Sequence, residues 1–162
     1  MNFEDPNKIE VVKSGVDFVF EQNSELIKAG TKEQYSEYLD DIFPNSKFKD
    51  IVFHGTNMKL DEIKFKSLGL TTAHFIDNKE FARLWAEDRT KSREEGSPEV
   101  YAVVVNILNN ENDWYDGVVN KYDNNGDVTG NEITMRRESD IHLLGSKQDI
   151  ENFKKFVSSK EK

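Results

Sequence analysis

Hydrophobic residues near the start of the chain recur every three or four positions, the spacing that places them on one face of an α-helix. Thr31 and Gln34 form a capping-box pattern, which marks the start of a helix, and Pro44 marks its end. We therefore predict helices within residues 9–43, packed as a layer on the rest of the chain. The apolar positions of this region are Ile9, Val12, Val16, Phe20, Tyr35, Tyr38, Leu39, Ile42 and Phe43.

From Asp50 onward the hydrophobic residues form short runs bounded by turn residues, which is typical of β-strands. The run Val100–Leu108 is apolar on both faces and predicts a strand in the interior of a sheet. Strands and helices do not alternate regularly, so the pattern favours an α+β fold over a doubly wound parallel sheet. The other expected strands are Ile51–Phe53, Leu70–Ile76, Ile133–Met135 and Ile141–Leu144.

Two further capping-box patterns predict helices in this second part of the chain. Asp77 with Glu80 opens one helix, and Ser146 with Asp149 opens a C-terminal helix. The stretch Asp123–Gly130 is rich in Asp, Asn and Gly and predicts a loop, and the loop expected before Glu132 extends back to Asp116. The apolar stripe expected on the first of these helices is Phe81, Leu84 and Trp85.

Length and composition limit the possible classes of protein. The 162 residues suffice for one domain with a small extension, so we assign residues 1–48 to a helical N-terminal extension and 49–162 to the main domain. The net charge of −9 argues against non-specific binding of nucleic acid, which requires positive charge near phosphates. The chain has no cysteine, which excludes disulfides, thiolate catalysis and Cys-ligated zinc. No apolar run is long enough to cross a bilayer and no secretion signal is evident, so a cytoplasmic location is expected.

Three short segments place polar groups where predicted strands begin or end. His54-Gly55-Thr56 closes a strand, and its glycine lets backbone groups approach a ligand closely. His74 precedes a helix that carries Trp85, and these two flat side chains suit the two sides of a planar ligand. Glu132 follows a loop and enters a strand, a common position for a functional group. Taken singly, each segment has an ordinary structural explanation: a turn, core packing or a solvated charge.

Taken in this order, the segments resemble the ADP-ribosyltransferases of the diphtheria-toxin and poly(ADP-ribose) polymerase branch. That branch carries His-Gly-[Ser/Thr], then a Tyr-Phe strand leading to a helix, then a Glu that opens a late strand. The matching residues here are His54-Gly55-Thr56, His74-Phe75 and Asn131-Glu132. The chain is most similar to small transferase domains of phage polyvalent proteins and mobile elements, from about Glu21 to Val157. The phrases that carry this similarity are Tyr35–Leu39, Ile42–Lys47, Asp50–Thr56 and Ile141–Ile150.

The resemblance implies a split antiparallel β-sandwich, in which two small sheets form a cleft for NAD. The implied activity is mono-ADP-ribosyl transfer, with NAD consumed, nicotinamide released and no metal required. Glu132 would stabilise the cationic ribose, His54 would bind the adenosine-side ribose, and the Gly55 backbone would bind the carboxamide. The implied catalytic residues are Glu132, His54 and His74, and the implied NAD contacts are His54, Gly55, Thr56, His74, Phe75 and Trp85.

The chain departs from the family pattern at three positions. His74 replaces the usual tyrosine, as in the similar tRNA 2′-phosphotransferases. Gly130 stands two residues before Glu132, where arginine-modifying toxins carry Glu or Gln, so the resemblance argues against arginine as the acceptor. Ala82 stands near the position where the polymerases carry a serine that contacts the carboxamide. Alanine has no hydroxyl, so this chain is expected to make one hydrogen bond fewer to NAD.

The residues leave three other functions open. One is a non-catalytic module that binds NAD or ADP-ribose. A second is transfer of an RNA 2′-phosphate to NAD, for which Arg136–Arg137 is a candidate basic pair. The third is NAD hydrolysis with water as the acceptor. For the transferase we expect a macromolecular acceptor, which is more often a protein than a nucleic acid in this expectation. We expect no membrane partner.

Overall fold

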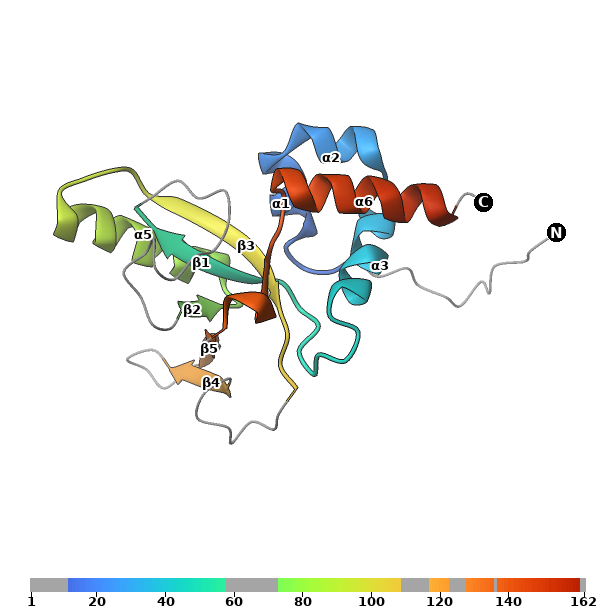
Figure 1. Cartoon of the computed structure of the whole chain (residues 1–162). Helices are drawn as coiled ribbons and strands as arrows, with labels where there is room; N and C mark the ends of the chain where they lie inside the picture. Colours follow the sequence, from blue (N-terminus) through green and yellow to red (C-terminus); the bar gives the residue numbers. More distant parts are fainter. Residues whose placement is uncertain (1–11, 58–72, 109–116, 123–127, 136, 161–162) are drawn as a thin grey trace.

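The computed structural model describes residues 12–57, 73–108, 117–122, 128–135 and 137–160. The described helices are α1 (Val16–Gln22), α2 (Ser24–Ala29), α3 (Lys32–Ile42), α5 (Lys79–Arg93), α6 (Lys147–Lys160) and the short 3-10 helix η1 (Glu138–Asp140). The described strands are β1 (Val52–Thr56), β2 (Ala73–Ile76), β3 (Glu99–Val105), β4 (Gly117–Tyr122), β5 (Val128–Met135) and β6 (Ile141–Leu143). Figure 1 shows the strands to one side of a group of helices, with α5 lying along β1.

The described strands form one antiparallel sheet in the order β4-β5-β2-β1-β3-β6. This confirms the predicted α+β class, and β3 lies inside the sheet, as its two-sided apolar pattern predicted. Two separate sheets were expected, and the structure instead joins β1 to β2. That join is short, because β1 and β2 share the single registered pair Phe53↔Ile76. β1 and β3, by contrast, pair over the whole range from Val52 to Thr56.

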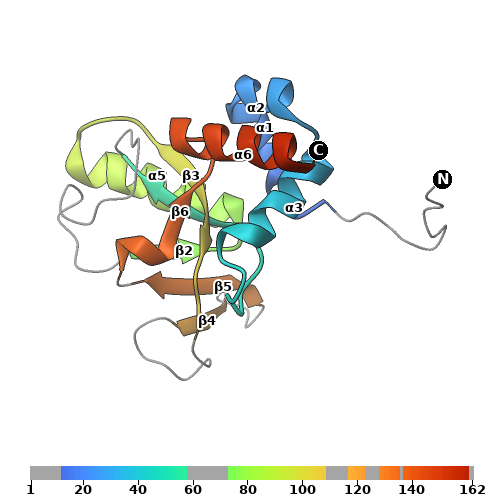
Figure 2. The ribbon, with the colours of Figure 1, turned by 45° about the vertical axis from the view of Figure 1, so that its right-hand side comes forward.

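Two hydrophobic clusters lie on opposite faces of this sheet. The first joins sheet residues such as Phe53 and Ala102 to helix residues such as Tyr35 and Phe153. α6, from the C-terminal part of the chain, therefore completes the helical layer that α1, α2 and α3 begin, as Figures 1 and 2 show. The second cluster, on the other face, consists of Val52, Phe75, Val103, Val105, Ile107, Ile133, Met135, Ile141 and Leu143.

The helix starts follow local side-chain chemistry. The predicted capping box of α3 is confirmed, with hydrogen bonds in both directions between Thr31 and Gln34. α6 is capped by the hydroxyl of Ser146, which accepts the backbone N–H three residues later. The predicted cap of α5 is wrong by one residue: the side chain of Asn78, not Asp77, accepts the first free N–H groups.

Two other expectations from the sequence are corrected. α1 begins only at Val16, because Gly15 has a φ of 100° and turns the chain there, so Val12 precedes the helix rather than lying on its stripe. Residues 116–130 are not simply a loop, since β4 (Gly117–Tyr122) pairs with β5 and Gly130 lies within β5. Residues 116 and 123–127 of the predicted loop lie outside the described residues.

Candidate active site where β1, β2 and β5 meet

Gly55 allows α5 to lie directly on β1. A Cβ atom at Gly55 would be 1.9 Å from the carbonyl oxygen of Ala82 and 2.9 Å from the backbone nitrogen of Ala86. Both alanines are fully buried, whereas Leu84 is 47% exposed and lies off the contact. The predicted apolar stripe is therefore wrong at Leu84. The close packing of α5 on β1 explains why residue 82 is a small alanine, whether or not a serine there would contact a ligand.

His54 is buried at the end of the β1–β2 join, with 1% of its surface exposed. Its Nδ1–H donates to the carbonyl of His74 at 2.9 Å, just beyond the one registered pair of these strands. Burial is the main cause that lowers the His54 pKa to about 4. A neutral ring that donates through Nδ1 has a lone pair on Nε2. This atom is buried and has no hydrogen-bond partner among the described residues.

His74 and Glu132 come together because β2 and β5 are neighbours. In the register His74 faces Thr134 and Ile76 faces Glu132, so all four side chains share one face of the sheet. The His74 Nδ1 lies 3.1 Å from the Thr134 hydroxyl and 3.5 Å from Glu132 Oε1. The side chain of Glu132 is 16% exposed and that of His74 is 44% exposed. A shielded carboxylate thus lies beside a more accessible imidazole.

The two imidazoles face opposite sides of the strand pair. Side chains alternate along a strand, so His54 shares a face with Val52 and Phe75, and His74 shares the other face with Ile76. The His54 ring packs against Phe75, with ring centroids 5.5 Å apart. His54 and His74 therefore meet through a backbone carbonyl and not ring to ring.

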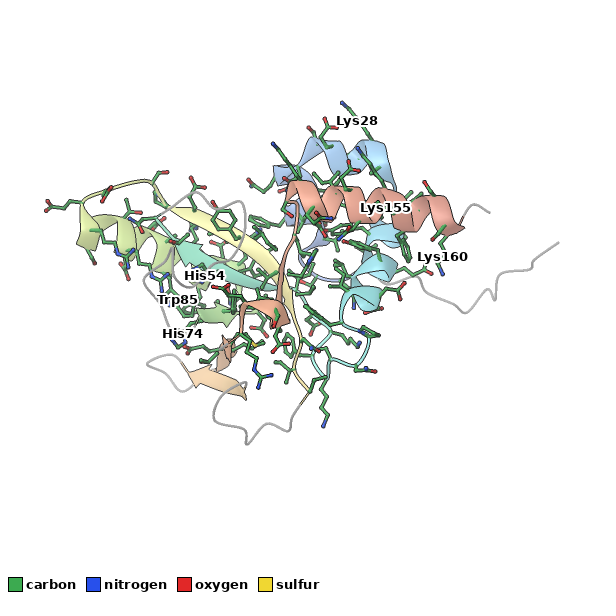
Figure 3. All side chains as sticks on the ribbon, viewed as in Figure 1. Lys28, His54, His74, Trp85, Lys155 and Lys160 are labelled. Atoms are coloured by element: carbon green, nitrogen blue, oxygen red, sulfur yellow. The ribbon has the colours of Figure 1, made fainter. Side chains whose placement is uncertain are left out.

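The remaining predicted contact residues surround this junction. Phe75 is fully buried in the second core cluster, and Thr56 is buried at the end of β1. Trp85 is partly buried on α5 and packs against the first core cluster, on the same face of the sheet as His74. Figure 3 shows His54, His74 and Trp85 in one region, around β1, β2 and α5.

Two arginines that sequence reasoning missed complete this region. Arg89 on α5 donates to the carbonyl of Gly55 at 2.7 Å, and Arg93 donates to Asn57 Oδ1 at 3.1 Å. Arg89 and Arg93 continue the line of Ala82 and Ala86 along the face of α5 that lies on β1. Their helical spacing is therefore the sequence signal that could have predicted where they lie. The Gly55 backbone is expected to bind the carboxamide, and its carbonyl oxygen accepts a hydrogen bond from Arg89 in this structure.

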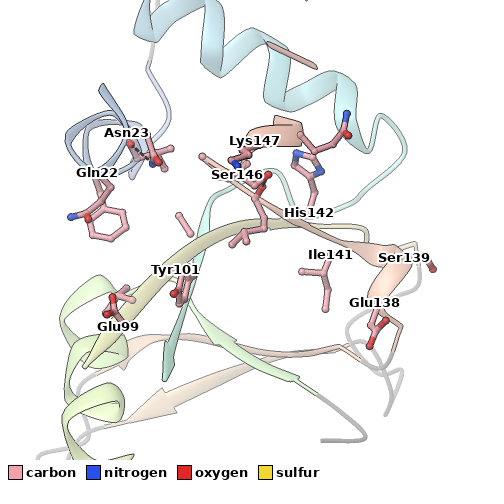
Figure 4. A pocket seen from close by; sticks show the side chains of 18 residues that line it. Gln22, Asn23, Glu99, Tyr101, Glu138, Ser139, Ile141, His142, Ser146 and Lys147 are labelled. Atoms are coloured by element: carbon pink, nitrogen blue, oxygen red, sulfur yellow. Dashed lines mark hydrogen bonds between the residues drawn. The ribbon is translucent and has the colours of Figure 1, made fainter. Parts of the chain in front are cut away.

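A separate groove of about 930 Å³ lies between α1, β3, β6 and the start of α6 (Figure 4). Its lining includes Gln22, Tyr101, Glu138, His142 and Lys147. None of the described residues that line it is a predicted catalytic or NAD-binding residue. The groove and the β1–β2–β5 junction are therefore distinct places on the molecule.

The Ile141–Ile150 phrase, one of those that carry the family resemblance, has a structural role here. Asp149 is fully buried and accepts four hydrogen bonds: from Tyr35 at 2.6 Å, Tyr38 at 2.7 Å, His142 at 2.7 Å and the Gly145 N–H at 2.8 Å. Burial, followed by the Asp149 charge, raises the pKa of both tyrosines, which keeps their hydroxyls protonated as donors. This carboxylate ties α3 to β6 and α6.

Comparison with known proteins adds no relative: no protein-family profile, curated protein sequence or solved structure matches this chain. None of the helices in the described part of the chain is both long enough and apolar enough to span a bilayer. Within the described ranges, no group of three or more His, Cys, Asp or Glu side chains is arranged to hold a metal ion.

Proposed function

We propose that this chain is an NAD-dependent mono-ADP-ribosyltransferase. The observation that supports this best is the meeting of three strands: His54 on β1 bonds to the His74 carbonyl on β2, and the His74 ring lies 3.5 Å from Glu132 on β5. These are the three residues that resemble the family's conserved set, and they are far apart in sequence. The short β1–β2 join also suits an ADP-ribosyltransferase-like fold, in which a cleft opens between two parts of the sheet.

The proposed reaction breaks the bond between nicotinamide and ribose in NAD. Positive charge then develops on the ribose, as it does in glycoside hydrolysis, and a nearby carboxylate stabilises it. Glu132 is the proposed carboxylate, because its limited exposure strengthens its interaction with a developing cation. The leaving nicotinamide takes the bonding electrons, and the acceptor's nucleophile attacks the ribose carbon and loses its proton.

The other residues are proposed to hold the substrate. The lone pair on His54 Nε2 suits a ribose hydroxyl, which donates the hydrogen bond. His74 and Trp85 are proposed to flank the nicotinamide, and Thr56 to support His54. Arg89 donates to one lone pair of the Gly55 oxygen, and the carboxamide NH₂ is proposed to donate to the other.

The proposal is tested by nicotinamide release from NAD, measured for the wild type and for Glu132→Gln. Glutamine keeps the size of the side chain and loses its charge, so turnover is expected to fall about a hundred- to a thousand-fold while NAD binding persists. Glu138→Gln is the matched control, because Glu138 is an exposed acid on η1 and should leave turnover unchanged. Near-wild-type turnover of Glu132→Gln would contradict the assignment, and a loss of turnover in Glu138→Gln would instead indicate Glu138 as the catalytic carboxylate.

The acceptor is proposed to be a protein residue other than arginine. Incubation with labelled NAD and a cell lysate should give a labelled macromolecule whose label is lost on protease treatment. Label lost with nuclease would instead indicate a nucleic-acid acceptor. Nicotinamide release without any labelled macromolecule would indicate water as the acceptor.

A further inference from the structure

Arg89 and Arg93 carry positive charge that no described carboxylate neutralises. Each has one hydrogen bond, to Gly55 or to Asn57, and neither forms an ion pair within the described part of the chain. Arg83, on the same helix, is different: it pairs with Glu80 at 2.9 Å and with Glu87 at 3.7 Å. In a chain with 31 acidic residues and a net charge of −9, two adjacent unneutralised arginines need an explanation.

Their arrangement has an electrostatic cost. Residues four apart on a helix are neighbours, and like charges there repel. Arg89 is also partly buried, and burial, together with the charge of Arg93, lowers its pKa. An anion bound between the two side chains would remove both the repulsion and part of the desolvation cost.

Their geometry also suits an anion. A guanidinium has five N–H donors in one plane. Arg89 uses one of them to bond to Gly55 on β1, and Arg93 uses one to bond to Asn57, which follows β1. Such planar donor sets match the oxygens of a phosphate better than a lysine does. The two bonds to Gly55 and Asn57 fix where the guanidiniums lie, at the end of β1, where Gly55 directly follows His54 in the chain.

We propose that Arg89 and Arg93 bind the pyrophosphate of the dinucleotide. This inference rests on the proposed function, which places one ribose at His54 and the carboxamide at Gly55. The pyrophosphate joins the two halves of NAD, so it must pass close to these neighbouring residues. Its two negative charges match the two arginines, whereas nicotinamide and ribose carry no negative charge.

The test is calorimetric titration of the whole chain with inorganic pyrophosphate, ADP-ribose and nicotinamide. Arg93→Gln is the main variant, because Arg93 is exposed and its loss should not disturb folding. We expect it to weaken pyrophosphate and ADP-ribose binding at least tenfold and to leave nicotinamide binding unchanged. Arg89→Gln should have the same effect, with its melting temperature recorded as a check on the fold. Arg83→Gln is the matched control and should bind all three ligands as the wild type does.

The outcomes separate this inference from the proposed function. Pyrophosphate binding that depends on Arg93, in a protein that releases no nicotinamide, would support the phosphate site and reject the transferase. Equal binding of ADP-ribose by the wild type and Arg93→Gln would overturn the inference, even if NAD is turned over. Failure of the wild type to bind pyrophosphate or ADP-ribose at millimolar concentration would also overturn it.

Discussion

His54 is held as a neutral imidazole in one tautomer. Burial lowers its pKa from 6.5 to about 4, although its hydrogen bond to the His74 carbonyl acts in the opposite direction. At neutral pH Nε2 can therefore accept a hydrogen bond and cannot donate one. A ribose hydroxyl fits such an acceptor and a phosphate oxygen does not, which separates the proposed role of His54 from that of the two arginines.

The buried His54 makes stability depend on pH. Between pH 6.5 and about 4 the unfolded chain protonates this histidine and the folded chain does not, so stability falls as the pH falls through this range. The loss attributable to His54 is on the order of 3 kcal/mol by pH 4, because one pKa unit corresponds to about 1.4 kcal/mol. Urea unfolding at several pH values should show a shallower slope for His54→Gln than for the wild type. Parallel slopes would show that His54 titrates normally.

At this scale, sequence reasoning found some residues and missed others for identifiable reasons. His54, His74 and Glu132 were proposed together because their local phrases resemble a known family, and the structure places them near one another. The opposite orientation of the two imidazoles was not predictable, since it depends on the register between β1 and β2. Arg89 and Arg93 were not predicted, because a spacing of four residues on a helix does not by itself indicate a binding site. The basic pair proposed from the sequence was Arg136–Arg137, of which Arg136 lies outside the described residues.

The contact of α5 with β1 is the element-level feature that shapes the candidate site. The strand was predicted from its apolar residues and the helix from its cap. The close approach of α5 to β1 was not predicted, because the absence of a Cβ at Gly55 was interpreted only as room for a ligand. The structure shows that the same glycine admits the backbone of Ala82. β4 was missed because its residues, GVVNKY, lie between Asp-rich stretches and have few consecutive apolar positions.

Gly55→Ala should therefore destabilise the protein strongly. The added methyl group would meet helix backbone at 1.9 Å, which rotamer changes cannot relieve, so α5 must shift away from β1. We expect a loss of about 3 kcal/mol or more in the free energy of unfolding, the upper range for overpacking. Gly30→Ala is the control, because its methyl group would meet the ends of the Gln34 and Phe153 side chains at 2.8 Å. Urea unfolding that gives equal losses for both variants would contradict the backbone explanation.

The whole molecule is held together by a core that crosses the boundary suggested by the sequence. The first hydrophobic cluster contains residues of α1, α2, α3 and α6 together with residues of β1, β2, β3 and α5. The division into residues 1–48 and 49–162 therefore does not separate two independent cores. Asp149 reinforces this union, since its four donors come from α3, from β6 and from the turn before α6.

Asp149→Asn should lower the stability of the whole molecule in a single transition. An amide has one acceptor oxygen and brings two N–H donors, so it cannot accept from Tyr35, Tyr38, His142 and the Gly145 N–H together. We expect a loss of about 3 kcal/mol or more, as for other broken buried charge networks. Circular dichroism, which reports mainly on the helices, and the fluorescence of Trp85 on α5, measured in a Trp114→Phe background, should shift by the same amount.

Asp41→Asn is the matched control, because Asp41 is exposed on α3 and should change the unfolding midpoint little. If the circular dichroism of Asp149→Asn changed at lower urea than its fluorescence, the helical layer would be unfolding before the sheet. Coincident transitions are expected instead, because Phe53, Ile76 and Ala102 of the sheet lose their apolar covering when the helices leave. The candidate site would then be lost together with the helical layer, since β1 carries both Phe53 and His54.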